Sequence, residues 1–313
     1  MPACPLLRFR SLIITARCWV RAGLLVGIVA LLGACSALRI GYSQAPDLMY
    51  WYLDGYVDFN SAQTPRVRDA LAQWLAWHRR TQLPDYAALL ARAQTEVMTD
   101  ITAARACEWQ RDVIRRADTA FDRAAPAVAD LLVTATPQQV QHLERHQAKA
   151  NDEFRKDYLQ PDLSKRAEVT LKRAVERAES LYGTLGEVQR ARMAEALLRS
   201  PFDPEAWLSE RRLRQQEALA LMRKFGGDEA ARQAAEAAVR AYVQRMEASP
   251  REPYRRYSER LNAFNCAFAA TLHNSTSAAQ RRTAAEKLAG WEGDARAIAA
   301  DVPRATPADL MSR

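Results

Sequence analysis

Hydrophobic positions recur at every third or fourth residue along most of the chain, which is the period of an amphipathic helix. Val67, Leu71 and Leu75 show this spacing, and the ranges 86–97 and 140–158 continue it. Alternating apolar and polar runs of the kind that form strands are missing. The pattern therefore predicts an all-α fold.

Prolines mark the beginnings of these runs, where a missing backbone N–H costs nothing. They are Pro46, Pro65, Pro84, Pro137, Pro204 and Pro253. Because the breaks between runs are short, we expect an elongated bundle of roughly nine or ten helices, mostly antiparallel neighbours.

A short polar residue followed three positions later by Gln or Glu precedes several runs. This is the capping box, which satisfies two backbone N–H groups at a helix start. The pairs are Asn60 with Gln63, Thr136 with Gln139, Thr184 with Glu187 and Ser277 with Gln280. The pattern also resembles the Thr-x-x-Gln repeats of small periplasmic helical chaperones, so a holdase-like chaperone is one functional alternative.

The N-terminus has the pattern of a signal peptide. Four arginines precede an apolar run at 22–34, and no acidic residue comes before it. At roughly 13 residues the run is shorter than the roughly 20 that a membrane-spanning helix needs. We expect residues 1–34 to be cleaved.

Leu32-Gly33-Ala34-Cys35 directly follows and resembles the lipobox of bacterial lipoproteins. The resemblance implies that Cys35 is acylated and becomes the mature N-terminus, which anchors the protein to a membrane. Ser36 in place of Asp favours the outer membrane, facing the periplasm. An ordinary secretory signal with a chance cysteine is the alternative.

Only two of the five cysteines then remain available for pairing, because Cys4 and Cys18 leave with the signal and Cys35 is acylated. Cys107 and Cys266 lie in an oxidising compartment, where an even pair suggests one disulfide. Two separate buried thiols are the alternative.

The exported protein should therefore contain no alkylatable thiol at Cys107 or Cys266. Intact-mass analysis after alkylation under native conditions measures this directly. A product that takes up two alkyl groups would contradict the disulfide.

Charge and composition exclude several classes of protein. The chain is 49% hydrophobic and 26% charged, unlike a disordered protein or one with many membrane spans. The four signal-peptide arginines account for half of the net charge of +8. Positive and negative charges are interspersed, and a protein outside the cytoplasm meets little nucleic acid, which argues against nucleic-acid binding. The mature chain has no phosphate-binding loop, hydrolase elbow or Cys-x-x-Cys pair, so no cofactor is predicted.

The pair Gly226-Gly227 suits a helix end and is the one candidate boundary inside the mature chain. It would separate an N-terminal bundle, residues 35–225, from C-terminal helices, residues 226–313, that pack on the same bundle. One continuous domain over 35–313 is equally compatible, and a hinge at the glycines is open.

The segment Pro46–Phe59 is apolar nearly all round and rich in Tyr and Trp. One interpretation buries it at the centre of the bundle. The other places its aromatic side chains at the headgroup level beside acylated Cys35.

Asp54 and Asp58 lie four residues apart, so a helix would place both carboxylates on one face. A neighbouring Arg or Lys is the expected partner, and a metal site or acid–base catalysis is the alternative. His78 lies on the apolar stripe of its own run, as a core histidine would, and would join an enzyme site if it folded against the aspartates. His142 and His146 lack the zinc-protease pattern and are expected on a solvated face, so no metal is predicted.

Several segments resemble a family of proteobacterial lipoproteins known only as a domain of unknown function. They are Arg39–Gln63, with its Gly-Tyr and Trp-Tyr-Leu-Asp-Gly-Tyr-Val-Asp pieces, Trp77–Pro84, Lys149–Arg155, Arg173–Glu179, Ser200–Asp203, Trp207 and Glu210–Gln216. The resemblance implies a helical envelope lipoprotein and no particular activity.

The sequence thus favours a non-catalytic lipoprotein that binds an envelope protein or polymer. An enzyme that modifies an envelope polymer or lipid with Asp54, Asp58 and His78 is the main alternative.

Overall fold

The computed structural model describes residues 37–301. The described residues form helices and no strand, so the all-α prediction is confirmed. The helices are α2 (Ala37–Ser43), α3 (Ala45–Val57), α4 (Gln63–Trp77), the π-helix η2 (His78–Gln82), α5 (Leu83–Glu96), α6 (Ala103–Val133), α7 (Pro137–Tyr158), α8 (Leu163–Tyr182), α9 (Glu187–Leu198), α10 (Pro204–Phe225), the 3-10 helix η3 (Glu229–Ala231), α11 (Arg232–Glu247), α12 (Glu252–Asn274) and α13 (Ala278–Ala300).

The chain divides into two compact units, Met1–Ala45 and Pro46–Arg313. Of the first unit the structure describes α2. The predicted signal peptide 1–34 and Cys35 lie outside the described residues, and the remaining helices belong to the second unit. The division at Gly226 stays a prediction.

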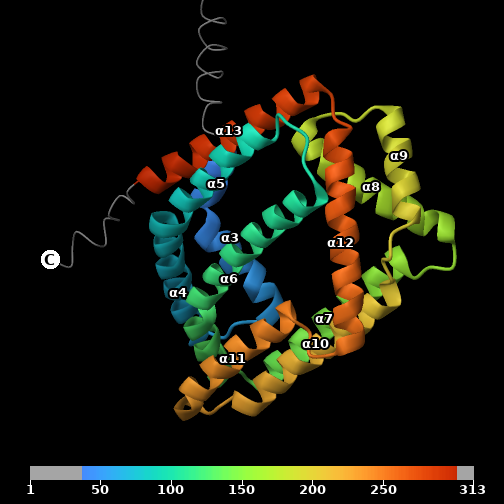
Figure 1. Cartoon of the computed structure of the whole chain (residues 1–313). Helices are drawn as coiled ribbons and strands as arrows, with labels where there is room; N and C mark the ends of the chain where they lie inside the picture. Colours follow the sequence, from blue (N-terminus) through green and yellow to red (C-terminus); the bar gives the residue numbers. More distant parts are fainter. Residues whose placement is uncertain (1–36, 302–313) are drawn as a thin grey trace, which may run out of the picture. The chain divides into compact units, whose positions relative to one another are not determined.

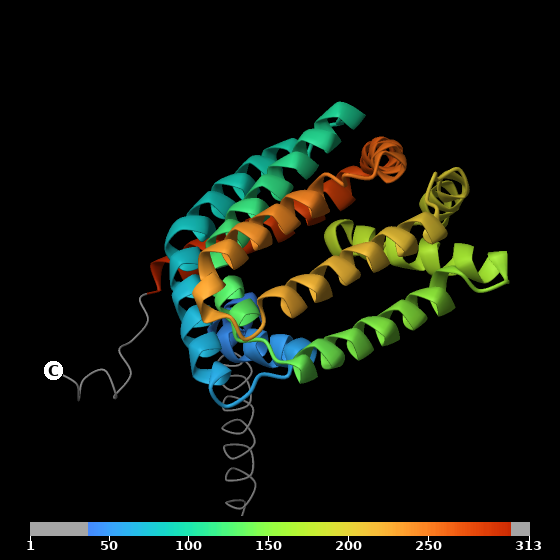
Figure 2. The same ribbon diagram turned by 90° about the horizontal axis from the view of Figure 1, so that it is seen from below.

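Within the second unit, helices far apart in sequence lie side by side. Figure 1 shows α13 running along α5, and α6 packs against both α11 and α12. Figure 2 shows α7 in green alongside α10 in gold. Long-range pairing of helices, rather than hairpins of sequence neighbours alone, organises this unit.

Alanines are the most completely buried residues of this unit. Ala87, Ala129, Ala235 and Ala284 are fully buried, while no large side chain in the described residues is. The buried residues divide into small clusters, for example Ala129 with Phe225 and Ala235, where α6, α10 and α11 meet. Small side chains let helix backbones approach closely, because little volume separates them.

A reciprocal pair of glutamines joins the starts of α4 and α7. Gln63 and Gln139 each donate from their amide nitrogen to the other's amide oxygen, at 3.3 and 2.6 Å. Gln63 also donates to the Thr134 carbonyl and Gln139 to the Asp58 carbonyl. Each glutamine oxygen completes the capping box that the sequence predicts at its own helix start. Two helix caps are thus linked into one buried polar network.

A second pair repeats this arrangement at the starts of α9 and α13. Gln189 and Gln280 exchange amide hydrogen bonds of 2.9 and 3.0 Å. The predicted box of Thr184 with Glu187 is wrong by two residues, because the backbone N–H of Gly186 donates to Gln189 instead. Gly183, with φ of 75°, and the turn after it place the helix start later than the Thr-x-x-Glu spacing suggested.

The glycine pair does end α10, as predicted. Gly227 has φ of 81°, and its N–H donates to the Val133 carbonyl. A Cβ at Gly226 would lie 2.6 Å from the Ala135 carbonyl oxygen. Both positions therefore need glycine, one for its backbone conformation and the other for close approach to the end of α6.

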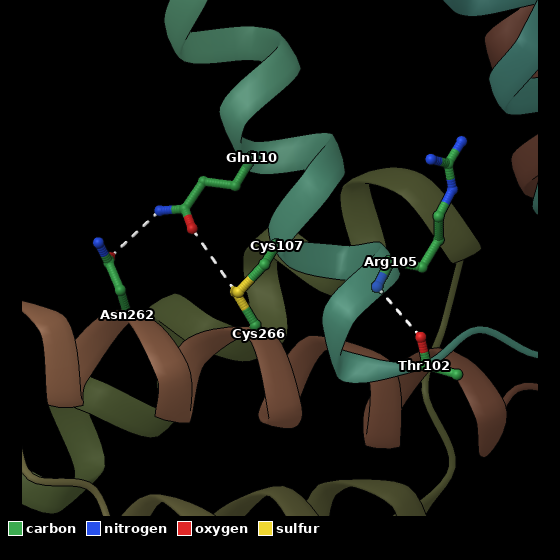
Figure 3. Close-up of a disulfide and its surroundings, with 6 residues drawn as sticks. All are labelled: Thr102, Arg105, Cys107, Gln110, Asn262 and Cys266. Carbon is green, nitrogen blue, oxygen red and sulfur yellow. Dashed lines mark hydrogen bonds between the residues drawn. A yellow bond between two sulfur atoms is a disulfide. The ribbon is translucent and has the colours of Figure 1, made fainter.

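Cys107 of α6 and Cys266 of α12 form a disulfide across 159 residues (Figure 3). The Gln110 side chain lies beside Cys266 Sγ and also donates to Asn262. Closing so long a loop restricts the unfolded chain, which the chain-entropy model values at about 5 kcal/mol at most.

We expect Gln139→Ala to lower the free energy of unfolding by about 1–3 kcal/mol, because it leaves buried polar partners such as Gln63 without a bond. Urea denaturation measures the difference. The neighbouring Gln138→Ala is the matched control, since Gln138 is exposed on the same helix. Equal stability of the two variants would contradict the role given to the glutamine pair.

Candidate functional site on α3, α7 and α10

The two aspartates of the predicted enzyme site do not share a helix face. Helix α3 ends at Val57, and Asp58 follows it with a left-handed φ of 58°. Asp54 accepts a hydrogen bond from the backbone N–H of Phe59 at 2.9 Å. The expected ion pair with Arg or Lys is not formed by either carboxylate within residues 37–301. Asp54 instead accepts the hydrogen bond from the backbone, and the side chain of Asp58 is exposed to solvent.

His78 lies in different surroundings, in the π-helix between α4 and α5. Its ring stacks on Trp74 at 4.9 Å between centroids and meets the edge of Tyr86 at 5.3 Å. Burial lowers the pKa of this imidazole. None of the contacts described for His78 joins it to Asp54 or Asp58, so the structure does not bring the predicted trio together.

Helix α3 is not at the centre of the bundle, contrary to the first interpretation of its apolar sequence. None of its residues is buried. Tyr50 hydrogen-bonds Thr64 at 2.9 Å and packs near Phe59, so α3 is attached through long side chains to its neighbours. The reason is that its apolar positions surround the whole helix, while only one side meets the bundle.

His142 and His146 contact this helix rather than a solvated face. His142 Nε2 lies 3.0 Å from the Gly55 carbonyl oxygen, to which it donates. The His146 ring packs on Tyr56 at 3.9 Å between centroids. Its Nδ1 is buried without a hydrogen-bond partner in the described residues, so packing on Tyr56 holds the imidazole. His142 and His146 therefore share one face of α7, as their i, i+4 spacing predicted, but this face contacts α3 and is not the solvated face that was expected.

Aromatic rings continue from this contact along α7 and α10. Phe154 stacks on Trp207 at 4.4 Å and lies 4.8 Å from Tyr158, whose ring meets the edge of Phe202 at 5.7 Å. All four rings are partly exposed. They join the end of α7, the start of α10 and the loop before it.

Two arginines flank these rings. Arg211 lies over Trp207 at 5.3 Å and Arg173 over Tyr158 at 5.0 Å, both within cation–π range. A hydrogen bond with Tyr52 and burial raise the pKa of Tyr56, and the nearby charge of Arg211 opposes this rise.

We call this surface the aromatic–cationic stripe. Its members are Tyr56, His146, Phe154, Tyr158, Arg173, Phe202, Trp207 and Arg211.

A family model covers the region that contains the stripe. Residues 55–255 match the model of DUF6279, described as a family of unknown function. The chain belongs to the DUF6279 family. Comparison with curated proteins and with solved structures found no match.

In this DUF6279 protein, segments that carry the sequence resemblance meet at the stripe. Lys149–Arg155 supplies Phe154, Ser200–Asp203 supplies Phe202, and Glu210–Gln216 supplies Arg211. The sequence alone assigns these segments no role. Their spacing within one helix could not reveal it, because the contacts join α7 to α10.

A buried polar network fixes α10 beneath the stripe. Asn151 and Gln215 exchange amide hydrogen bonds of 2.8 and 3.3 Å between α7 and α10. Glu210, only 3% exposed, accepts two hydrogen bonds from Arg251 and one from Arg214. Burial acts to raise the pKa of Glu210, but the bonds from Arg251, Ser249 and Arg214 outweigh it and lower the pKa.

The described residues contain no group of three His, Cys, Asp or Glu side chains that could hold a metal ion. Across 37–301, every helix is too short or too polar to cross a membrane.

Glu210 should make stability depend on pH. Its pKa is lower in the folded protein than in the unfolded chain, so its stabilisation is complete above the unfolded pKa of about 4.3 and is lost as pH falls through the folded pKa. We expect Glu210→Gln to unfold more easily at pH 7 and to lose less stability between pH 6 and pH 3 than the parent protein. Urea denaturation at several pH values measures both effects.

Glu195→Gln is the control, because Glu195 pairs with Arg199 on the solvent-exposed surface of α9. Parallel pH profiles for the parent and Glu210→Gln would contradict the role given to Glu210.

Proposed function

We propose that this DUF6279 protein is a periplasm-facing lipoprotein anchored to the membrane by acylated Cys35. It binds a component of the cell envelope through the aromatic–cationic stripe. The lipobox after a signal-peptide pattern supports the anchor and its outer-membrane location. The stripe supports binding without catalysis.

Arg211 carries the binding part of the proposal. Many arginines of the described structure, including Arg173, are paired with a carboxylate. Arg211 forms no ion pair within residues 37–301, yet it is fixed over the Trp207 ring and near Tyr56. A guanidinium held in place in this way can give two parallel hydrogen bonds to a carboxylate or phosphate.

The partner that fits is an anionic envelope polymer or an acidic protein segment. Partly exposed rings of Phe154, Tyr158 and Trp207 offer flat apolar surface beside the cation. Such a surface follows an extended chain better than it encloses a small molecule, because the rings lie in sequence along two helices.

The enzyme alternative lacks the convergence that it requires. Asp54 is bound to the backbone of Phe59, Asp58 lies beyond the end of α3, and His78 packs among aromatic rings of α4 and α5. The chaperone alternative rested on the Thr-x-x-Gln pattern. The glutamines of this pattern bond to one another and to helix starts, so the pattern has a structural explanation and no longer favours a chaperone. We therefore propose neither.

Cys35→Ala should abolish incorporation of radiolabelled palmitate and release the protein from the membrane fraction, because the acylated thiol is gone. Cys18→Ala is the control, since that cysteine lies in the cleaved segment, and it should label like the parent protein. Palmitate incorporation that survives Cys35→Ala, or is absent from the parent, would overturn the anchor.

A photo-crosslinking amino acid at Phe202, which is partly exposed and leaves the contact of Arg211 with Trp207 intact, should capture the partner in living cells. Adding Arg211→Gln should reduce the crosslinked product about tenfold, because a hydrogen bond to a charged group contributes about 1.5–3 kcal/mol. Arg192→Gln, on the exposed face of α9, is the matched control. The unfolding midpoint should change little in either variant, since neither arginine has an ion-pair partner among the described residues and the cation–π contact of Arg211 contributes only about 0.5–1 kcal/mol.

A probe at Leu198, which is 76% exposed on α9, tests whether capture is specific to the stripe. Equal capture from both positions, or capture from Phe202 that is insensitive to Arg211→Gln, would contradict the proposal.

A further inference from the structure

Helix α3 carries an apolar ridge that is open to solvent in the described structure. Leu48, Trp51 and Tyr52 are 56%, 75% and 58% exposed. Gly55 is also exposed, and a Cβ there would meet nothing within 4 Å. The spacing places all four on one face of the helix. We call these residues the α3 ridge.

The opposite side of α3 is attached to the bundle, so the ridge has a fixed direction. On that side Tyr50 bonds to Thr64 of α4, and at the C-terminal end of α3 the ring of His142 of α7 donates to the backbone carbonyl of Gly55. Asp47, at the margin of the ridge, pairs with Arg68 at 2.6 Å. These contacts use the polar atoms of α3 and leave an uncharged surface of Leu, Trp and Tyr facing outward.

This composition suits the boundary between lipid headgroups and acyl chains. Trp and Tyr are enriched there, because their rings are apolar while the indole N–H and phenol O–H still reach polar partners. A helix with one apolar face lies in that boundary without crossing the membrane.

We propose that the α3 ridge lies in the interfacial layer of the same leaflet that holds the acyl chains of Cys35. The inference rests on the proposed lipid anchor. Leu48 follows Cys35 by 13 residues, which span at most about 45 Å when fully extended. Helix α2 shortens this distance further, because a helix advances only about 1.5 Å per residue.

The short connection is the reason that the lipid surface, rather than a protein, is the proposed occupant. Once Cys35 is anchored, the leaflet is present beside α3 at high effective concentration, whereas a soluble partner has to be recruited. The ridge and the anchor then act as two attachments, and together they fix which side of the bundle faces the membrane.

The test places a nitroxide spin label on the full, acylated protein in vesicles of phosphatidylethanolamine and phosphatidylglycerol. Trp51→Cys carries the label, with the native disulfide left oxidised. Collision with a water-soluble nickel complex should fall several-fold on reconstitution, and collision with oxygen should rise. Leu198→Cys is the control, since Leu198 is equally exposed but lies on α9, and its accessibility should stay unchanged.

Flotation of the same vesicles separates this inference from the anchor. Protein that fails to float shows that the anchor has failed. Protein that floats with a water-accessible label at position 51 overturns the α3 inference alone. Shielding that appears only at high protein-to-lipid ratio also overturns it, because a second copy would then cover the ridge.

A second variant confirms the result without a label. Trp51→Glu should leave flotation intact and increase proteolysis within α3 several-fold over the parent, since a charged ridge leaves the interface. Leu198→Glu should not change proteolysis of α3. Unchanged protection of α3 in Trp51→Glu would overturn the inference.

Discussion

Burial of alanine, rather than of large side chains, between helices is the constraint on which the rest of the second unit depends. Ala87, Ala129, Ala235 and Ala284 are fully buried, and no large side chain of the described structure is. Alanine lets two helices approach, but each contact removes little apolar surface from water, at about 25 cal/mol per Å². Apolar burial alone therefore specifies the alignment of these helices weakly.

Hydrogen bonds between amide side chains fix the alignment of the helices that apolar burial specifies only weakly. The glutamine pairs Gln63 with Gln139 and Gln189 with Gln280 fix four helix starts, and Asn151 with Gln215 fixes α7 on α10. A buried amide has a strong geometric preference, because a shifted helix would leave its N–H or C=O groups unbonded. The disulfide adds a covalent link between α6 and α12.

The same architecture explains why aromatic side chains remain available for binding. With alanine at the fully buried positions, large rings such as Phe154 and Trp207 lie where they stay partly exposed. Arg211 is fixed over one of them without a carboxylate partner in the described residues. At α3 the aromatic surface extends further outward, since only one side of that helix meets the bundle.

The sequence by itself determined the local structure, because helix period, proline positions and capping boxes depend on residues within a few positions of one another. It indicated the all-α fold, the helix starts capped by Thr136 and Ser277, and the end of α10 at the glycine pair. Cys107 and Cys266 were predicted as disulfide partners because they are the two cysteines left after the signal peptide and the acylated Cys35 are set aside. Between Thr184 and Gly186 two possible helix starts lie close together in sequence. The turn after Gly183 places the start of α9 at the later one, so the predicted capping box was wrong by two residues.

Only the tertiary structure decided which helix faces meet. The same i, i+4 spacing that suggested a solvated face for His142 and His146 describes a face that contacts α3. An apolar sequence could not show whether α3 is buried, because burial depends on the neighbours a helix finds. The stripe likewise joins residues of α3, α7, α8 and α10, and its members are separated by up to 155 positions in the chain, counting from Tyr56 to Arg211. Such contacts are set by packing between helices, which no local pattern encodes.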